Sequence, residues 1–142
     1  MNFLELIAKI EIYLASVLEE QAKNSENEKK IMIFDKCPID NIAFIEREQL
    51  DEMLEKLDTN YNEIINSYDL ILHLETVAKS YPELYSHENN SNRTLNKELA
   101  IKRNDRLLEA YEQCKNRVVI NGYKNIKDKQ EKVIEEIEKI LI

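Results

Sequence analysis

The stretch Asp69-Leu70-Ile71-Leu72-His73-Leu74 decides the fold class of this chain. It is a short apolar run, too short for a helix, and it is typical of a strand buried on both faces. Two other runs share this signature, Ile31-Met32-Ile33-Phe34-Asp35 and Arg117-Val118-Val119-Ile120-Asn121. We therefore predict three strands, over residues 31–35, 69–74 and 117–121.

Helical patterns separate these strands. Residues 3–22 and 126–142 carry apolar side chains at three- and four-residue steps, which is the period of an amphipathic helix. The apolar pattern of residues 41–66 predicts two short helices. Residues 95–114 predict a further helix by their pattern, and it follows an irregular stretch. Strands separated by helices pair in parallel through right-handed crossovers. The sequence thus predicts an α/β fold, with a parallel three-stranded sheet flanked by helices in one domain over residues 1–142.

The ends of the predicted strands are the first places to look for a site. In open parallel sheets, ligands bind outside the carboxyl ends of the strands. Asp35, Glu75 and Asn121 stand at or just past those ends.

Composition limits the classes of partner. The 142 residues include 20 Lys or Arg and 28 Asp or Glu, so the formal net charge is −8. This charge repels nucleic acid and anionic membranes, and we expect neither as a partner. No apolar run has the length of a membrane-spanning helix, and charged residues interrupt the first apolar segment, which argues against a secretory signal. We expect a cytoplasmic protein.

Glycine is almost absent from the chain. Gly122 is the single glycine, so neither G-x-x-x-x-G-K-[ST] nor G-x-G-x-x-G can occur in these residues. A lone glycine after a strand suggests a backbone position that needs positive φ or close approach, although a plain turn explains it equally well.

The order of segments resembles a known family, the AAA-type P-loop domain of bacterial nicotinamide riboside kinases that regulate NAD biosynthesis and of the eukaryotic TRP-translocation-defect protein. In that family an apolar strand ends in Asp-Arg, a second Asp follows, and a Tyr-Asp-apolar strand comes later. The similar residues here are Ile31 to Phe44, with Lys36 in place of the Arg, and Tyr68 to Leu74. Later matches are Tyr85, Asn90, Arg93, Glu98-Leu99-Ala100, Asp105, Tyr111, Val118 to Gly122, and Lys127 or Lys129.

The resemblance implies a partial fold. The family's first strand, which is central in the sheet, and its phosphate-binding loop should precede residue 2. Their absence from these residues implies a truncated gene product, a domain completed by another polypeptide, or a pseudoenzyme. ATP and Mg²⁺ are expected only if the missing loop is supplied, and a small-molecule substrate is possible.

The resemblance also implies roles for particular residues. Asp35 would hold Mg²⁺ through water or accept a proton from a substrate hydroxyl, whereas its structural alternative is a cap before Pro38. Asp40 could face the substrate, but an N-cap of the helix that starts at Asn41 is the better interpretation. Arg93 would balance the charge of the transferred phosphoryl group, with a solvated arginine as the equal alternative. Arg103 and Arg106 could join it, but solvated helix charges are favoured.

Two further groups of residues complete the candidates. Asn121 and Gly122 would cradle the adenine edge, as the equivalent segment does in related kinases. The residues His73, His87, Cys37 and Cys114 lack the spacing of metal ligands, and a histidine in an apolar strand is more often a satisfied core residue. We therefore discount metal binding by protein ligands of this kind and take both cysteines as free thiols.

Two functions of different classes follow. The first is the carboxyl-terminal part of an ATP-binding P-loop nucleoside-kinase-like domain that is inactive as an isolated chain. The alternative is a non-catalytic interaction module that binds a partner through its amphipathic terminal helices.

Overall fold

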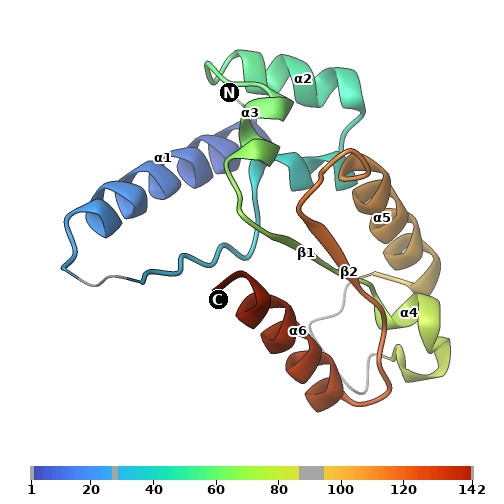
Figure 1. The fold of residues 1–142 in the computed structure, drawn as a ribbon. Helices are drawn as coiled ribbons and strands as arrows, with labels where there is room; N and C mark the ends of the chain where they lie inside the picture. The colour runs from blue at the N-terminus through green and yellow to red at the C-terminus, as the bar shows by residue number, and fades with distance from the viewer. Residues whose placement is uncertain (1, 27–28, 87–94, 142) are drawn as a thin grey trace. The chain divides into compact units, whose positions relative to one another are not determined.

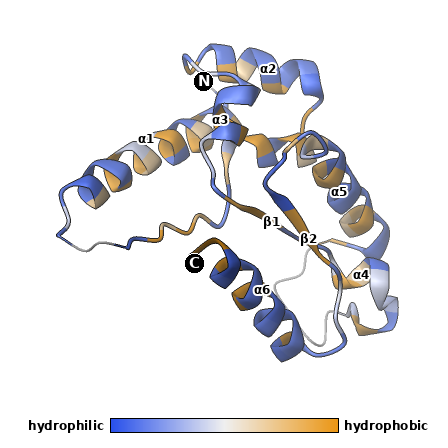
Figure 2. Cartoon of the chain, viewed as in Figure 1, coloured by the Kyte–Doolittle hydropathy of each residue, from blue (hydrophilic) through white to orange (hydrophobic). Residues whose placement is uncertain are grey.

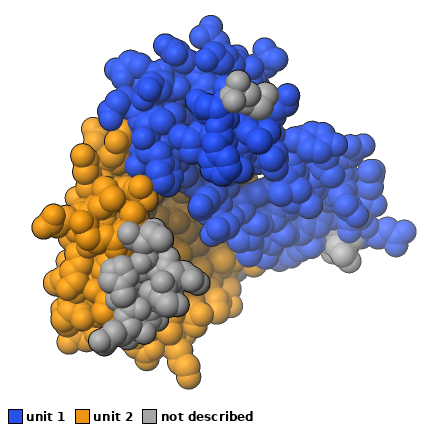
Figure 3. All heavy atoms as spheres, turned by 180° about the vertical axis from the view of Figure 1, so that it is seen from behind, with its two compact units in different colours: residues 1–64 blue, residues 65–142 orange. Residues whose placement is uncertain are grey.

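The computed structural model describes residues 2–26, 29–86 and 95–141. The chain divides into two compact units, residues 1–64 and 65–142 (Figure 3), and each is described by itself. The prediction that they form one domain stays a prediction. None of the helices in the described residues is long and apolar enough to cross a membrane.

The first unit is helical (Figure 1). The elements in chain order are α1 (Phe3–Lys23), the 3-10 helix η1 (Pro38–Ala43), α2 (Arg47–Glu55) and α3 (Tyr61–Asn66), the last of which ends beyond residue 64. The predicted N-terminal helix is confirmed, and the side chain of Asn2 caps it by accepting the N–H of Glu5 at 2.9 Å. The two short helices predicted within residues 41–66 are confirmed as α2 and α3.

The core of this unit forms where α1 and α2 contact η1. Ala8 of α1 is fully buried, as are Ile39, Leu50 and Leu54. The opposite side of α1 keeps large apolar side chains exposed, among them Phe3 at 73% and Tyr13 at 70%. Figure 2 shows the hydrophobic residues that recur along α1.

The predicted strand over residues 31–35 is wrong. These residues are described, yet they form no strand, and the sheet of the described chain has only β1 and β2. Ile31, Met32 and Ile33 are 52%, 41% and 78% exposed. An extended apolar run becomes a strand only when neighbouring backbone accepts its hydrogen bonds, because the run cannot satisfy its own backbone groups. The sheet therefore has two parallel strands where three were predicted.

The second unit contains this sheet and the helices that flank it. Its elements are β1 (Ile71–Leu74), α4 (Val77–Ser80), the 3-10 helix η2 (Pro82–Leu84), α5 (Lys97–Ala110), β2 (Arg117–Ile120) and α6 (Ile126–Leu141). The strands pair in parallel, with Ile71 opposite Arg117 and Leu74 opposite Ile120. The predicted strands 69–74 and 117–121 and the predicted parallel pairing are confirmed, with slightly shorter bounds.

The carboxyl ends of β1 and β2 lie side by side, and polar side chains gather just after them. α6 contacts β2, and α4 contacts α5. Ile120 is fully buried at the end of β2, and the pairing continues past β1 because the N–H of Glu75 donates to the carbonyl of Ile120 at 2.8 Å. The segments just after both strands are thereby fixed next to one another.

Candidate functional site

The polar cluster at the carboxyl ends of β1 and β2 centres on Glu75, which is only 9% exposed. One carboxylate oxygen, Oε2, accepts the Ser80 hydroxyl at 2.5 Å and the Gly122 N–H at 3.3 Å. The other, Oε1, lies 3.7 Å from the ammonium of Lys79. Burial acts to raise the pKa of Glu75, but these hydrogen bonds and the nearby positive charge outweigh burial and lower it. Glu75 is thus an ionised anchor that holds α4 to the loop after β2.

Gly122 is needed for close approach. A Cβ added there would lie 2.7 Å from the Cβ of Ser80 and 2.9 Å from its Oγ. The sequence suggested that this glycine serves either positive φ or close approach. Gly122 does not have positive φ, so close approach is the reason that the structure shows. Gly122 is buried and its N–H is bound to Glu75, whereas the neighbouring Asn121 is exposed.

A second set of polar contacts joins β1 to α5. His73 is 8% exposed, and its Nε2 lies 3.1 Å from Oδ1 of Asn104, which also accepts the N–H of Thr76 at 3.0 Å. His73 is therefore a satisfied core histidine, as the sequence favoured. Asn104 is 5% exposed, and we did not foresee its role, because nothing in a largely polar helix sequence marks one amide as buried.

Lysine side chains contribute from α4 and α6. Lys79 binds Asp105 of α5 at 2.7 Å, and this charge and its hydrogen bond raise the pKa of Lys79. Lys129 reaches from α6 to donate to the carbonyl of Glu75 at 2.7 Å, and burial lowers the pKa of its ammonium. The cluster thus contains two lysines and two carboxylates from four segments.

Asp35 lies in the first unit, exposed and in a bend after the extended residues. The structure does not test the proposed role of Asp35, but Asp35 does not lie at the end of a strand, where the sequence had predicted it.

Asp40 is the third residue of η1 and accepts the N–H of Cys37 at 3.1 Å in a capping box, so it contributes to capping from within the first turn. The N-cap itself is Cys37, and the helix begins at Pro38 rather than at the predicted Asn41. Nearby, Oε2 of Glu11 is buried without a hydrogen-bond partner, and burial together with the charge of Asp40 raises the pKa of Glu11.

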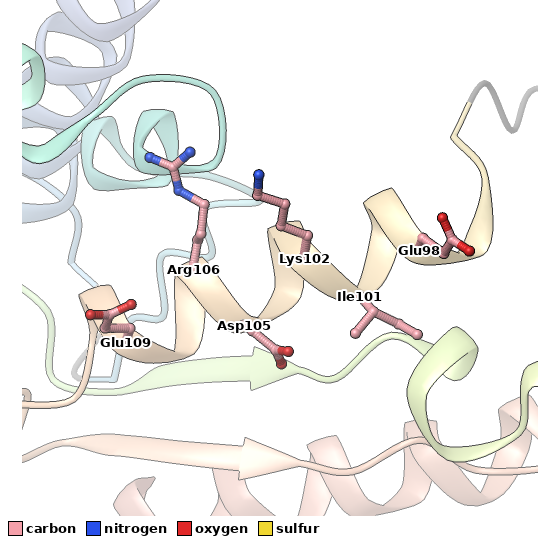
Figure 4. Close-up of a pocket in the computed structure, with 6 residues that line it drawn as sticks. All are labelled: Glu98, Ile101, Lys102, Asp105, Arg106 and Glu109. Carbon is pink, nitrogen blue, oxygen red and sulfur yellow. The ribbon is translucent and has the colours of Figure 1, made fainter.

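Three arginines were proposed for the phosphate clamp, and one of them, Arg103, lies half-buried on α5. Arg93 lies outside the described residues, so its role stays a prediction. Arg106 lines an open hollow of about 520 Å³ along α5 (Figure 4). Lys102 extends from the same side of the helix as Arg106, and Asp105 extends from the other. The lining also includes Glu98, Ile101 and Glu109. Because its charges have both signs, the hollow does not favour an anion.

The residues present fit Mg²⁺ and ATP only in part. Within the described residues, no group of three or more His, Cys, Asp or Glu side chains could hold a metal ion. Mg²⁺ usually takes one or two carboxylates and completes its shell with water and phosphate oxygens, so a single exposed carboxylate such as Asp35 is compatible with it. The glycine-rich cradle for the phosphates is absent from these 142 residues.

Comparison with known proteins gives one match. A family model described as an AAA domain matches residues 4–129 of the chain. No curated protein and no solved structure was found to match it.

Proposed function

This chain belongs to the AAA domain family, and from that premise we propose that it forms the carboxyl-terminal part of a P-loop nucleotide-binding domain related to nucleoside kinases. The observation that carries the proposal is the parallel pair of strands whose carboxyl ends meet at one ordered polar cluster. Such an edge is the usual ligand site of an open α/β sheet. The proposal extends to the more specific resemblance to nicotinamide riboside kinases and the TRP-translocation-defect protein.

The reaction we propose is transfer of the γ-phosphoryl group of ATP to a hydroxyl of a small nucleoside-like substrate. ATP is the donor substrate, and Mg²⁺, which Asp35 would hold through water, would supply positive charge to balance the phosphates. The phosphate loop is supplied by residues outside these 142, in the same polypeptide or in another. Asn121 contributes its exposed amide to the edge of the base, and Gly122 shapes the loop behind it. Asp35 either holds Mg²⁺ through water or accepts the proton of the substrate hydroxyl, and Arg93 binds the transferred phosphoryl group.

The unaided chain is expected to be inactive. Phosphoryl transfer depends on a backbone cradle and a lysine that position the β and γ phosphates, and these residues contain no such motif. The test is Mg²⁺-ATP binding by calorimetry together with a turnover assay, on the chain alone and on a fusion that carries a family-type phosphate loop. ATP affinity and transfer should appear only in the fusion. Turnover by the chain alone that Asp35→Asn abolishes would contradict the proposal.

A second candidate function has its own observation. The terminal helices expose large apolar side chains, including Phe3 and Tyr13 on α1, and Ile126 at 66% and Ile134 at 54% on α6. Exposed apolar residues that recur along a helix favour a protein partner. A non-catalytic interaction module predicts that substitutions of these residues abolish partner binding, while the fusion binds no ATP.

A further inference from the structure

The side chain of Lys124 covers the ring of Tyr81. Its ammonium lies 5.5 Å from the ring centroid, within the range of a cation–π contact. Tyr81 directly follows α4 and is partly buried, whereas Lys124 belongs to the loop between β2 and α6 and is exposed. The contact of a solvated lysine with an aromatic ring is weak, so another group can displace the Lys124 side chain from the face of Tyr81.

This ring stands beside the loop after β2. Gly122 packs against Ser80 so closely that a Cβ would be 2.7 Å away, and Tyr81 is the next residue after Ser80. The Glu75 carboxylate binds both sides of this contact, through the Ser80 hydroxyl and the Gly122 N–H. These contacts hold the backbone just before Tyr81 against the loop after β2, so the Tyr81 ring and Lys124 belong to neighbouring segments.

We propose that Tyr81 is the stacking platform for the base of the nucleotide, with the Asn121 amide at the edge of the base and Lys124 as a displaceable cover. This inference rests on the proposed function, which places a nucleotide at this edge of the sheet. An aromatic ring offers a flat apolar face to a base, and an amide offers one donor and one acceptor in nearly the same plane. Adenine needs both, at its N1 and its exocyclic amine.

The test uses adenosine, which has no phosphate and so does not depend on the phosphate loop. The 142-residue chain, labelled with ¹⁵N, is titrated with adenosine to millimolar concentration, and the amide shifts of Asn121, Gly122 and Lys124 are followed. Tyr81→Leu should weaken binding by roughly 5- to 150-fold, the range for loss of one base–aromatic stack. Tyr81→Phe should keep the affinity, since the ring remains.

Two controls separate stacking from damage to the fold. Tyr13→Leu removes an exposed tyrosine of the first unit and should leave the affinity unchanged. Lys124→Ala uncovers the ring at an exposed position and should leave the affinity equal or higher. Absence of adenosine binding, an unaffected Tyr81→Leu variant, or a loss with Lys124→Ala would overturn the inference. If the fusion binds ATP while Tyr81→Leu has no effect, the platform fails and the proposed function stands. If adenosine binds through Tyr81 while the fusion transfers no phosphoryl group, the kinase proposal fails instead.

Discussion

Replacing Gly122 with alanine tests the close packing of the loop after β2 on α4. The new Cβ would meet the Cβ of Ser80 at 2.7 Å and its Oγ at 2.9 Å, while the carbonyl of Thr76 lies at an ordinary 3.6 Å. Carbon atoms in contact prefer about 3.5–4.0 Å, so loop and helix must separate by most of an ångström. Because the Cβ of Ser80 is fixed to the backbone, a change of rotamer cannot relieve the contact.

The expected cost follows from two opposing effects. Overpacking of this kind costs about 1–3 kcal/mol of stability. Alanine also restricts the unfolded chain, which returns about 0.4–1 kcal/mol wherever the native backbone tolerates it. The backbone does tolerate it here, because Gly122 does not have positive φ. We therefore expect Gly122→Ala to destabilise the second unit by about 1–2 kcal/mol.

Native-state hydrogen exchange of the β1 and β2 amides measures this effect within the second unit. A loss of 1–2 kcal/mol should speed exchange through opening of the unit by roughly 5- to 30-fold. Ser80→Gly removes the opposing Cβ, so the double variant should recover part of the loss beyond additivity. Asn121→Ala, at the exposed neighbouring position, should change stability by less than about 0.5 kcal/mol. A Gly122→Ala variant as stable as the parent chain would refute the close approach.

Four further outcomes are expected. The pKa of Glu75 is lowered in the folded chain, so the ionised carboxylate stabilises the fold above the ordinary pKa of 4.5, and this stabilisation is lost as the pH falls below 4.5. Hydrogen exchange of the β1 amides should therefore accelerate below pH 4.5. The acceleration should be smaller in Glu75→Gln, which lacks the titrating group. The pKa of Glu11 is raised, so its ionised form opposes folding; Glu11→Gln should raise the urea midpoint at pH 7 and lose that advantage in acid, and an unchanged midpoint would refute the effect of burial. Asn104→Ala leaves the N–H of Thr76 without its acceptor and should cost about 1–3 kcal/mol in urea unfolding, and a neutral result would contradict the buried hydrogen bonds. In the fusion, Arg93→Ala should lower the transfer rate far more than the ATP affinity, because the arginine would bind negative charge that develops in the transition state. Asp35→Asn should lower the rate and the magnesium dependence together. A fusion whose rate is unchanged by both substitutions would contradict the kinase assignment.

Much of the local structure could be predicted from the sequence. The bounds of α1 and α6 followed from helical periodicity, and β1 and β2 followed from short apolar runs, because these patterns reflect which faces of an element must avoid water. Parallel pairing followed from the length of the intervening segments. The run at residues 31–35 has the same pattern as β2 and yet forms no strand, since strand pairing depends on a neighbour that the run itself does not encode.

The candidate site divides in the same way. The sequence by itself determined that Glu75, Asn121 and Gly122 follow strands, that no glycine-rich phosphate cradle occurs in these residues, and which family the order of segments resembles. Only the tertiary structure decided that Gly122 abuts Ser80, that Asn104 is buried beside His73, and that Lys124 covers Tyr81. These contacts join residues 31 to 43 positions apart, and their distances depend on how α4, α5 and the loop after β2 pack together. A sequence pattern records which face of each element is apolar, but it does not record which polar groups of different elements meet.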